Sequence, residues 1–456
     1  MKKAGILLPI FSLPSIDGVG TFGKSAYEFV DQIKASGLHY WQILPLNPLD
    51  SSYSPYQTIS SFAGETVYID LTLLKENGLL EQIEWEHFDV HWADYRRVKI
   101  FKEPYFKQAF ENFTPAHSWY PDFIHFKEKT WWLDHFCEFK VLYRTNNKNE
   151  WSTWQQFEID ETLKEFEAFK QYLFYRQWQE LKKYANDQGI EIIGDLPFYV
   201  GYNSEDVYFN KQLFKLDENN QPSCVSGVPP DYFNPDGQRW NHPIYNWEAL
   251  EKEHFNYWVD KILQACQTVD VLRLDHFRAF DTYWEVDVHS LGARDGSWQE
   301  APGHALFTEL FNRYPNLNLI VEDLGYLREE VYQLKDRFGF KGMKIMQFSF
   351  EETLNQQIPE NCLYYTGTHD NDTLLGWITE ENIDYSIDEL LEMALSTAAE
   401  IVIIPLQDFL GLDDSSRINS PGTIGTQNWT WRIDSLEDFA EKCESIKTML
   451  ERAQRI

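Results

Sequence analysis

The 456-residue sequence is poor in basic residues and in cysteine, and it has no long hydrophobic run. Its 40 Lys and Arg residues stand against 72 Asp and Glu residues, so the formal net charge is −32. Nucleic acids and anionic membranes bind proteins through basic surfaces, so this deficit argues against both as main partners. It also disfavours a polyanionic substrate. No stretch approaches the roughly 20 apolar residues that are needed to span a bilayer.

The five cysteines are odd in number and far apart, and they lack the pairing of a metal site: Cys137, Cys224, Cys266, Cys362 and Cys443. This usage favours reduced thiols in a cytoplasmic protein over a disulfide framework. Residues 4–10 are apolar, but Pro9 and Pro14 interrupt the run and no small-residue cleavage site follows. We therefore interpret the segment as a buried first strand and not as a signal peptide.

The composition is that of a folded protein with a large core. The chain is 43% hydrophobic and 16% aromatic, which excludes general disorder. Its length corresponds to about three domain-sized units, or to one barrel-type domain with insertions. The charge leaves a neutral, polyhydroxylated substrate possible. The 17 Trp, 25 Tyr and 32 Phe residues would suit the apolar faces of sugar rings, although most aromatics in such a chain are core residues.

Eight short apolar runs predict strands, and several alternate with helical patterns. Buried strands joined by helices predict an α/β protein with a parallel sheet, and eight of them predict a closed (β/α)₈ TIM barrel. The active site of such a barrel lies at the carboxyl ends of its strands. The clearest helical patterns are Ala26, Phe29, Val30 and Ile33 before Gly37, and Leu327, Val331, Leu334 and Phe338 before Gly339. The runs are residues 5–10, 39–46, 190–197, 269–276, 319–324, 342–348, 362–369 and 401–408.

Two stretches interrupt the alternation. Residues 73–183 are charged and rich in tryptophan, which predicts a mostly helical insertion. Residues 201–247 are rich in Asn, Asp, Gly, Pro and aromatics, which predicts a long loop acting as a lid or binding loop. We therefore expect one catalytic domain over residues 1–456 with two insertions, and no separate C-terminal β-domain.

Several of the runs end in polar residues that a buried strand would not contain. Arg273-Leu274-Asp275-His276, Glu322-Asp323 and His369-Asp370-Asn371-Asp372 close three of them, and Asp195 lies near the end of a fourth. A barrel would bring these ends together at one mouth. Neighbouring carboxyl groups shift each other's pKa values apart, giving one proton donor and one anion. That pair is the equipment for cleaving a glycosidic bond.

Each motif alone has a plainer interpretation. An Arg-x-Asp sequence is often a local ion pair, and Glu322-Asp323 could cap the helix near Leu327. Residues 368–371 could form a polar turn or hold a metal, although no third ligand has characteristic spacing. The catalytic interpretation is favoured because all of the motifs end strands of the same architecture.

These motifs resemble the 4-α-glucanotransferase family (amylomaltase or disproportionating enzyme, glycoside hydrolase family 77) of the α-amylase clan, over nearly the whole chain. The stretch Gly227-Val228-Pro229-Pro230-Asp231-Tyr232-Phe233 is much more specific to this family than the clan motifs are. The other matching stretches are Trp41-Gln42-Ile43-Leu44-Pro45-Leu46, Ser54-Pro55-Tyr56-Gln57, Ser61-Phe62-Ala63-Gly64, Gly194-Asp195-Leu196-Pro197, Gly237-Gln238-Arg239-Trp240, Arg273-Leu274-Asp275-His276-Phe277-Arg278, Glu322-Asp323-Leu324-Gly325, Thr366-Gly367-Thr368-His369-Asp370-Asn371, Arg417-Ile418-Asn419, Pro421-Gly422-Thr423 and Asn428-Trp429.

The resemblance implies a retaining double displacement on maltooligosaccharides and α-1,4-glucans, without a cofactor or a metal. Asp275 would be the nucleophile, held ionised by Arg273. Glu322 would be the general acid and then the base. Asp370 would hold the hydroxyl groups of the distorted sugar.

The resemblance also implies substrate contacts. His276 and His369 would donate hydrogen bonds to the same sugar, and Asp195 would support this subsite. Tyr56 would stack beside the donor sugar, within the motif that contains Ser54. On the acceptor side, the loop of residues 226–247 would cover the site. The further predicted contacts are Tyr232, Phe233, Gln238, Trp240 and Asn428.

The sequence departs from the family at a few positions. Glu65 stands where Asn is usual, Asn241-His242 replaces the commoner Gly-Asn, and Ser51-Ser52 replaces a glycine-containing approach. These changes concern acceptor preference more than the core chemistry. An α-amylase-like hydrolase is the nearest alternative function. A relative that only binds sugar is the second, and the joint presence of Asp275, Glu322 and Asp370 speaks against it. The oligomeric state does not follow from the sequence.

Overall fold

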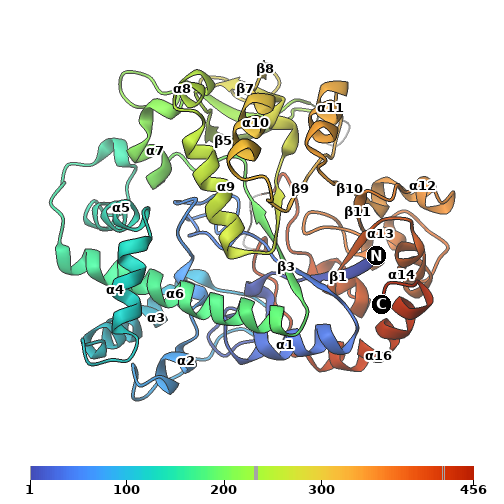
Figure 1. Ribbon diagram of the computed structural model, residues 1–456, viewed down its shortest axis with the longest axis horizontal. Coiled ribbons are helices and arrows are strands. Elements are labelled where there is room, and N and C mark those ends of the chain that lie inside the picture. The colour runs from blue at the N-terminus through green and yellow to red at the C-terminus, as the bar shows by residue number, and fades with distance from the viewer. Residues whose placement is uncertain (1, 231–234, 424, 426) are drawn as a thin grey trace.

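The centre of the molecule is an eight-stranded parallel barrel, seen in a computed structural model that describes residues 2–230, 235–423, 425 and 427–456 (Figure 1). The strand order β10-β11-β12-β1-β2-β3-β6-β9 follows the chain around the barrel. It closes between β9 and β10, where the Val321 N–H donates to the Lys341 carbonyl at 2.9 Å. The strands are β1 (Lys3–Leu7), β2 (Tyr40–Gln42), β3 (Glu191–Leu196), β6 (Val271–Leu274), β9 (Leu319–Val321), β10 (Gly342–Ile345), β11 (Cys362–Tyr365) and β12 (Ile401–Pro405).

Seven of the eight predicted runs contain one of these strands, and the first run overlaps β1, which begins two residues earlier at Lys3; the predicted (β/α)₈ barrel is confirmed. The strands are buried on both faces because alternate side chains point into the barrel and out towards the helices. Inside, Ile193, Val271 and Ile320 belong to one apolar cluster. Outside, Ile192 and Leu272 belong to the larger cluster beneath the helices. Two-sided burial is why the runs are continuous in the sequence.

The two helices with the clearest patterns form as expected. In α1 (Lys24–Ala35) the four patterned residues are buried, and in α11 (Glu329–Phe338) Val331 and Leu334 are. Gly37 and Gly339 follow these helices with φ of 76° and 67°, a left-handed conformation that glycine adopts without strain. The other helices around the barrel and its loops are α2 (Leu71–Glu76), α8 (Trp247–Lys252), α9 (Asn256–Thr268), α10 (Gly303–Arg313), α12 (Phe350–Leu354), α13 (Leu374–Glu380), α14 (Ile387–Ser396), α15 (Leu406–Leu410) and α16 (Glu437–Arg452).

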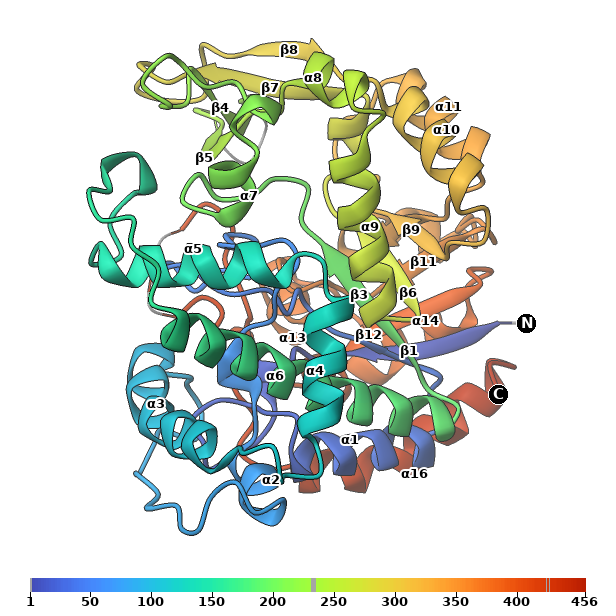
Figure 2. The same cartoon turned by 60° about the vertical axis from the view of Figure 1, so that its left-hand side comes forward.

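Residues 73–183 contain mostly helix, and these helices lie together on one side of the barrel (Figure 2). The last helix continues past this range and joins the barrel, where the Tyr184 hydroxyl donates to Asp31 of α1 at 2.6 Å. A buried ion pair of 2.8 Å between Lys102 and Asp17 ties the first of them to the loop after β1. The helices are α3 (Tyr95–Asn112), α4 (Tyr120–Lys129), α5 (Leu133–Thr145) and α6 (Glu161–Asp187).

Residues 201–247, expected as a long loop, instead contain regular structure. The segment includes α7 (Glu205–Phe209) and two strands, β4 (Cys224–Val228) and β5 (Gln238–Pro243). These strands join β7 (Thr282–Asp287) and β8 (Ser297–Glu300) in an antiparallel sheet of order β5-β4-β7-β8, at the top of Figure 1. The polar, half-exposed residues of β5 show no apolar alternation, which hid this strand in the sequence.

Two further expectations concern the thiols and the membrane. All five cysteines are free, and four of them are buried, in agreement with the expected reduced thiols. Within the part of the chain that the structure describes, no helix is long and apolar enough to cross a membrane.

Arg455, which follows α16, lies at the starts of β1 and β12. Its guanidinium is 1% exposed and donates to four carbonyl groups, including that of Lys3 in β1 at 3.1 Å. The other three belong to residues just before β12: Leu395, Thr397 and Ala399. Burial lowers the pKa of Arg455 to about 10. This side chain therefore joins the first and last barrel strands.

We predict that Arg455→Ala destabilises the protein strongly, because it leaves buried carbonyl groups without donors. A loss of about 3 kcal/mol is expected, since hydrogen bonds to charged groups are worth roughly 1.5–3 kcal/mol each and water enters the gap in part. Thermal unfolding measures the change. Arg452→Ala is the matched control, because Arg452 is exposed and pairs only with Glu392. Equal melting temperatures for the two variants would contradict the prediction.

Candidate active site

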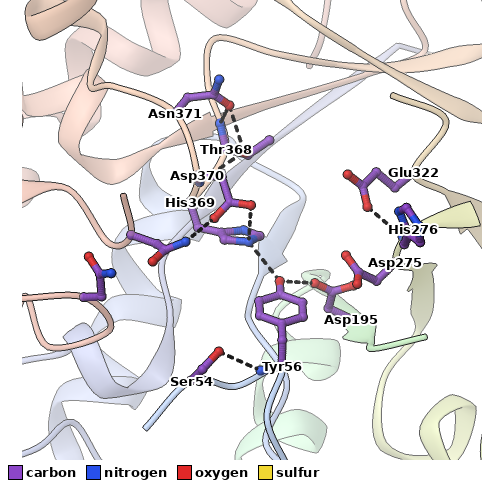
Figure 3. A network of polar contacts seen from close by, with 12 residues as sticks. Ser54, Tyr56, Asp195, Asp275, His276, Glu322, Thr368, His369, Asp370 and Asn371 are labelled. Carbon is purple, nitrogen blue, oxygen red and sulfur yellow. Dashed lines mark hydrogen bonds and ion pairs between the residues drawn. The ribbon is translucent and has the colours of Figure 1, made fainter. Parts of the chain in front are cut away.

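The polar residues at the strand ends converge at the mouth of the barrel, as the sequence predicts. Figure 3 shows Asp370 and His369 on one side, and Asp275, Glu322 and His276 on the other. Tyr56 and Asp195 lie between the two groups in that view. Strands β6 and β9 end directly before Asp275 and Glu322, and these ends are aligned because the Glu322 N–H donates to the Leu274 carbonyl at 3.0 Å.

Arg273 is the buried cation at the centre of this site. Its guanidinium contacts both oxygens of Asp195 at 2.7 and 2.6 Å. It also lies 3.2 Å from Asp275 and 3.1 Å from Glu322. The residue is 3% exposed. Three carboxyl groups from different strands can lie together here because this charge offsets part of their mutual repulsion.

Asp275 and Glu322 interact as a coupled pair. Burial and the nearby Glu322 raise the pKa of Asp275 well above its usual range, although Arg273 lowers it. Burial also acts to raise the pKa of Glu322, but Arg273 and Asp275 bring it below its usual value. Arg273 thus acts on Asp275 in the predicted direction, but burial and Glu322 outweigh its effect. Two carboxyl groups so close titrate as a coupled pair, and their pKa values move in opposite directions.

The backbone of His276 holds Glu322 in place. The His276 N–H donates to Glu322 Oε2 at 2.7 Å, and the residue has φ of 49°, a left-handed conformation that is uncommon outside glycine. Burial lowers the pKa of the His276 ring to about 4, so the ring is neutral at pH 7. The alternative role of Glu322-Asp323 as a helix cap is wrong, because Arg328 precedes α11 and no side chain caps it.

Tyr56 connects the two sides of the site. Its hydroxyl donates to Asp195 at 2.6 Å and lies 3.0 Å from Nε2 of His369. The Tyr56 and His369 rings are stacked with centroids 5.3 Å apart. Ser54 makes a local contact with Tyr56, because its hydroxyl accepts a hydrogen bond from the Tyr56 N–H at 3.3 Å. One hydrogen-bonded chain thus runs from His369 through Tyr56 and Asp195 to Arg273.

Asp370 lies at the end of this chain, on a loop after β11. His369 Nε2 is 3.4 Å from Asp370 Oδ2, and Asn419 donates to Asp370 Oδ1 at 2.7 Å. The ring of Trp429 lies 5.7 Å from Tyr56 and 5.8 Å from His369. Asn419 and Trp429 were not predicted as site residues. Their signal was present, because both belong to motifs near the C-terminus that resemble the family.

The loop of residues 366–374 forms the polar turn that was one of its possible interpretations. The Asn371 side chain accepts from the Thr368 N–H and hydroxyl at 2.9 and 2.8 Å. The Asp370 N–H donates to the same hydroxyl at 3.3 Å. Among the residues that the structure describes, no group of three or more His, Cys, Asp and Glu side chains could hold a metal ion.

The predicted acceptor residues are only partly brought to the carboxyl groups. Trp240 packs edge-on against His276, with ring centroids 5.1 Å apart. Its indole N–H donates to Gln238 at 3.3 Å, so these two residues of β5 belong together. Asn428 instead bonds within its own loop, accepting from the Ser420 N–H at 3.1 Å. The predicted contacts Tyr232 and Phe233 lie outside the described residues.

The departures from the family pattern have local explanations. Glu65 is buried, accepts from the Leu49 N–H at 2.9 Å and pairs with Lys99 of α3 at 3.0 Å. Asn241, where glycine is commoner, has φ of 63°, a conformation that asparagine tolerates. His242 is buried, and its Nδ1 lies 3.1 Å from the Ser226 hydroxyl of β4. Burial lowers the pKa of His242 to about 4.

Comparisons with known proteins agree with this geometry. A family model described as 4-alpha-glucanotransferase matches residues 8–437. The 4-alpha-glucanotransferase of Aquifex aeolicus is 38% identical over 99% of each chain, and that of Streptococcus pneumoniae is 37% identical over 95% of this chain and 93% of its own. The solved structure of amylomaltase from Streptococcus agalactiae in complex with acarbose superposes with a TM-score of 0.94, at 34% identity and full coverage of both chains.

We predict that Tyr56→Phe lowers kcat/KM for maltotriose about tenfold while the protein stays folded. The change keeps the ring but removes the hydroxyl that joins Asp195 to His369, and one hydrogen bond to a charged group is worth roughly 1.5–3 kcal/mol. Glucose release measures the rate. Tyr53→Phe is the matched control, because the Tyr53 ring instead stacks on Tyr95. An unchanged kcat/KM for Tyr56→Phe would show that the Tyr56 hydroxyl does not contribute to the reaction.

Proposed function

Because the chain belongs to the 4-alpha-glucanotransferase family, it is an enzyme that transfers glucan segments, and we propose that it does so by a retaining double displacement centred on Asp275 and Glu322. The observation that carries this proposal is the contact of Arg273 with three carboxyl groups, two of which titrate as a coupled pair. A double displacement needs one anion to attack and one acid to donate.

In the first step, Asp275 attacks the anomeric carbon of the donor sugar and Glu322 protonates the departing glycosidic oxygen. The products are a β-glycosyl ester on Asp275 and the released sugar. In the second step, the Glu322 carboxylate takes the proton of an incoming 4-hydroxyl group, and that oxygen displaces Asp275. The configuration inverts twice and is therefore retained.

The mechanism requires the shared proton on Glu322, whereas burial and repulsion favour it on Asp275 in this arrangement. We infer that a bound sugar moves the proton. The glycosidic oxygen offers Glu322 a hydrogen-bond acceptor, and the partial positive charge of the anomeric centre favours the Asp275 anion.

Residues opposite the pair would hold the distorted sugar. Asp370 accepts hydrogen bonds from sugar hydroxyls, and these bonds strengthen in the transition state. His369 and His276 donate to the same sugar, and Tyr56 stacks beside it. Asp195 keeps Arg273 and Tyr56 in place through bonds of 2.6 Å to each. The site thus combines a reacting pair with a rigid support.

On the acceptor side, residues 201–247 would form a cover that favours sugar over water. Trp240 offers a ring face near His276, and Gln238 can bond hydroxyl groups. The family resemblance adds Tyr232 and Phe233 as stacking partners and Asn428 as a hydroxyl contact. The donors and acceptors are maltooligosaccharides and α-1,4-glucans. The reaction uses only side chains of this chain. The reduced cysteines are typical of a cytoplasmic protein.

Incubation with maltotriose alone tests transfer directly. We expect glucose and a ladder of longer oligosaccharides, with the total number of reducing ends unchanged, because each bond broken is replaced by a new one. Chromatography follows chain length, and a reducing-end assay follows hydrolysis. A net rise in reducing ends that matches glucose release would favour an amylase-like hydrolase. Absence of any reaction would favour a protein that only binds sugar.

The roles of the two carboxyl groups can be separated with α-maltosyl fluoride. We predict that Glu322→Gln still reacts with this donor and accumulates a covalent adduct on Asp275, because fluoride leaves without protonation while the second step lacks its base. Mass spectrometry detects the adduct. Asp275→Asn is the matched acid-to-amide variant, and it should form no adduct and lose several orders of magnitude in rate. Near wild-type turnover of Asp275→Asn would refute the nucleophile assignment.

A further inference from the structure

The loop of residues 366–374, which carries His369 and Asp370, has both of its ends tied to one buried carboxylate. This carboxylate belongs to Asp408 on α15, directly after β12. Its Oδ2 accepts a hydrogen bond from the Thr366 hydroxyl at 2.5 Å, where the loop leaves β11. Its Oδ1 accepts from the Leu374 N–H at 2.7 Å, where α13 begins. The Asp408 carboxylate therefore holds the two ends of the loop together.

Asp408 is buried without a neighbouring cation. It is 1% exposed, and burial raises its pKa to about 6. None of the ion pairs among the described residues includes it. A buried carboxylate without a cation is costly unless its oxygens accept hydrogen bonds. Here both oxygens do, and both donors belong to the ends of the catalytic loop.

The same segment supports the loop at further points. Asp414 accepts from the Thr373 N–H at 2.8 Å and from its hydroxyl at 3.2 Å. Arg417 pairs with Asp372 and donates to the Asp370 carbonyl at 3.1 Å. These contacts are more exposed than those of Asp408, so the most deeply buried support of the loop is the Asp408 carboxylate.

We propose that Asp408 is a positioning residue that sets the distance of Asp370 and His369 from the Asp275–Glu322 pair. The proposal rests on the proposed function of Asp370. The Asp370 side chain is half exposed, and among the described residues it contacts Asn419 and His369, so its position depends strongly on where the loop begins and ends. Misplacement by about 1 Å can cost on the order of a hundredfold in rate.

The test compares Asp408→Asn and Thr366→Val with two matched controls. Asn cannot accept from both ends with equal strength, and Val removes the Thr366 donor at similar volume. Thr366→Ser keeps the hydroxyl and should retain activity. Asp413→Asn changes an exposed neighbouring acid whose side chain bonds Ser415. With maltotriose, we expect kcat to fall about tenfold or more in the first two variants, with KM changed less than about threefold.

A double-mutant cycle with Asp370→Asn separates positioning from general destabilisation. If Asp408 acts through Asp370, then Asp408→Asn costs about tenfold in the wild-type background but much less in the Asp370→Asn background. Equal factors in both backgrounds, or a change in melting temperature with kcat preserved, would overturn the proposal.

Failure of the underlying function has a different signature. If Asp370→Asn alone keeps wild-type turnover, the role of Asp370 is refuted and the positioning role of Asp408 fails with it. If Asp370→Asn is strongly impaired while Asp408→Asn and Thr366→Val are as active as Asp413→Asn, only the positioning role is refuted. If Asp408→Asn does not fold, the double-mutant cycle is measured with Thr366→Val and Asp370→Asn instead, and Thr366→Ser is the control.

Discussion

The buried guanidinium of Arg273 is the interaction on which the active site depends. Carboxyl groups that follow β6 and β9, and one within β3, all reach it within 3.2 Å. Burying several acids together is unfavourable unless a cation and hydrogen bonds compensate. Arg273 supplies that compensation from inside a strand, where its own position is set by the barrel. The chemistry at the mouth is therefore built on the register of the parallel strands.

Side-chain contacts connect Arg273 to the opposite side of the site, and the helical insertion supports that side. Through Asp195, Arg273 is connected to Tyr56 and then to His369 on the far side of the site. The helical insertion supports the same side, since Tyr95 of α3 donates to the Trp429 carbonyl at 2.9 Å and Trp429 packs on Tyr56. The insertion thus supports the side of the site that carries Tyr56 and His369, and buried contacts attach it to the barrel.

The sequence predicts the barrel and the position of Asp275 and Glu322 at its mouth because both have a local signature. Strands buried on two faces are continuous apolar runs, and Asp275 and Glu322 directly follow such runs. The strands β4 and β5 lack that signature, because their stability comes from pairing with β7 far along the chain. Which of the two groups has the raised pKa was also not predicted. It depends on distances between β6 and β9, which no local pattern contains.

The closure of the barrel also constrains how the protein is made. β1 pairs with β12 along its whole length, from Lys3 opposite Ile401 to Leu7 opposite Pro405. Arg455 then bonds the carbonyl of Lys3 from the end of the chain. One edge of β1 is therefore covered only when β12, far along the chain, pairs with it. Contacts so distant in sequence slow folding, and they leave an edge of β1 open to pairing with other chains until β12 covers it.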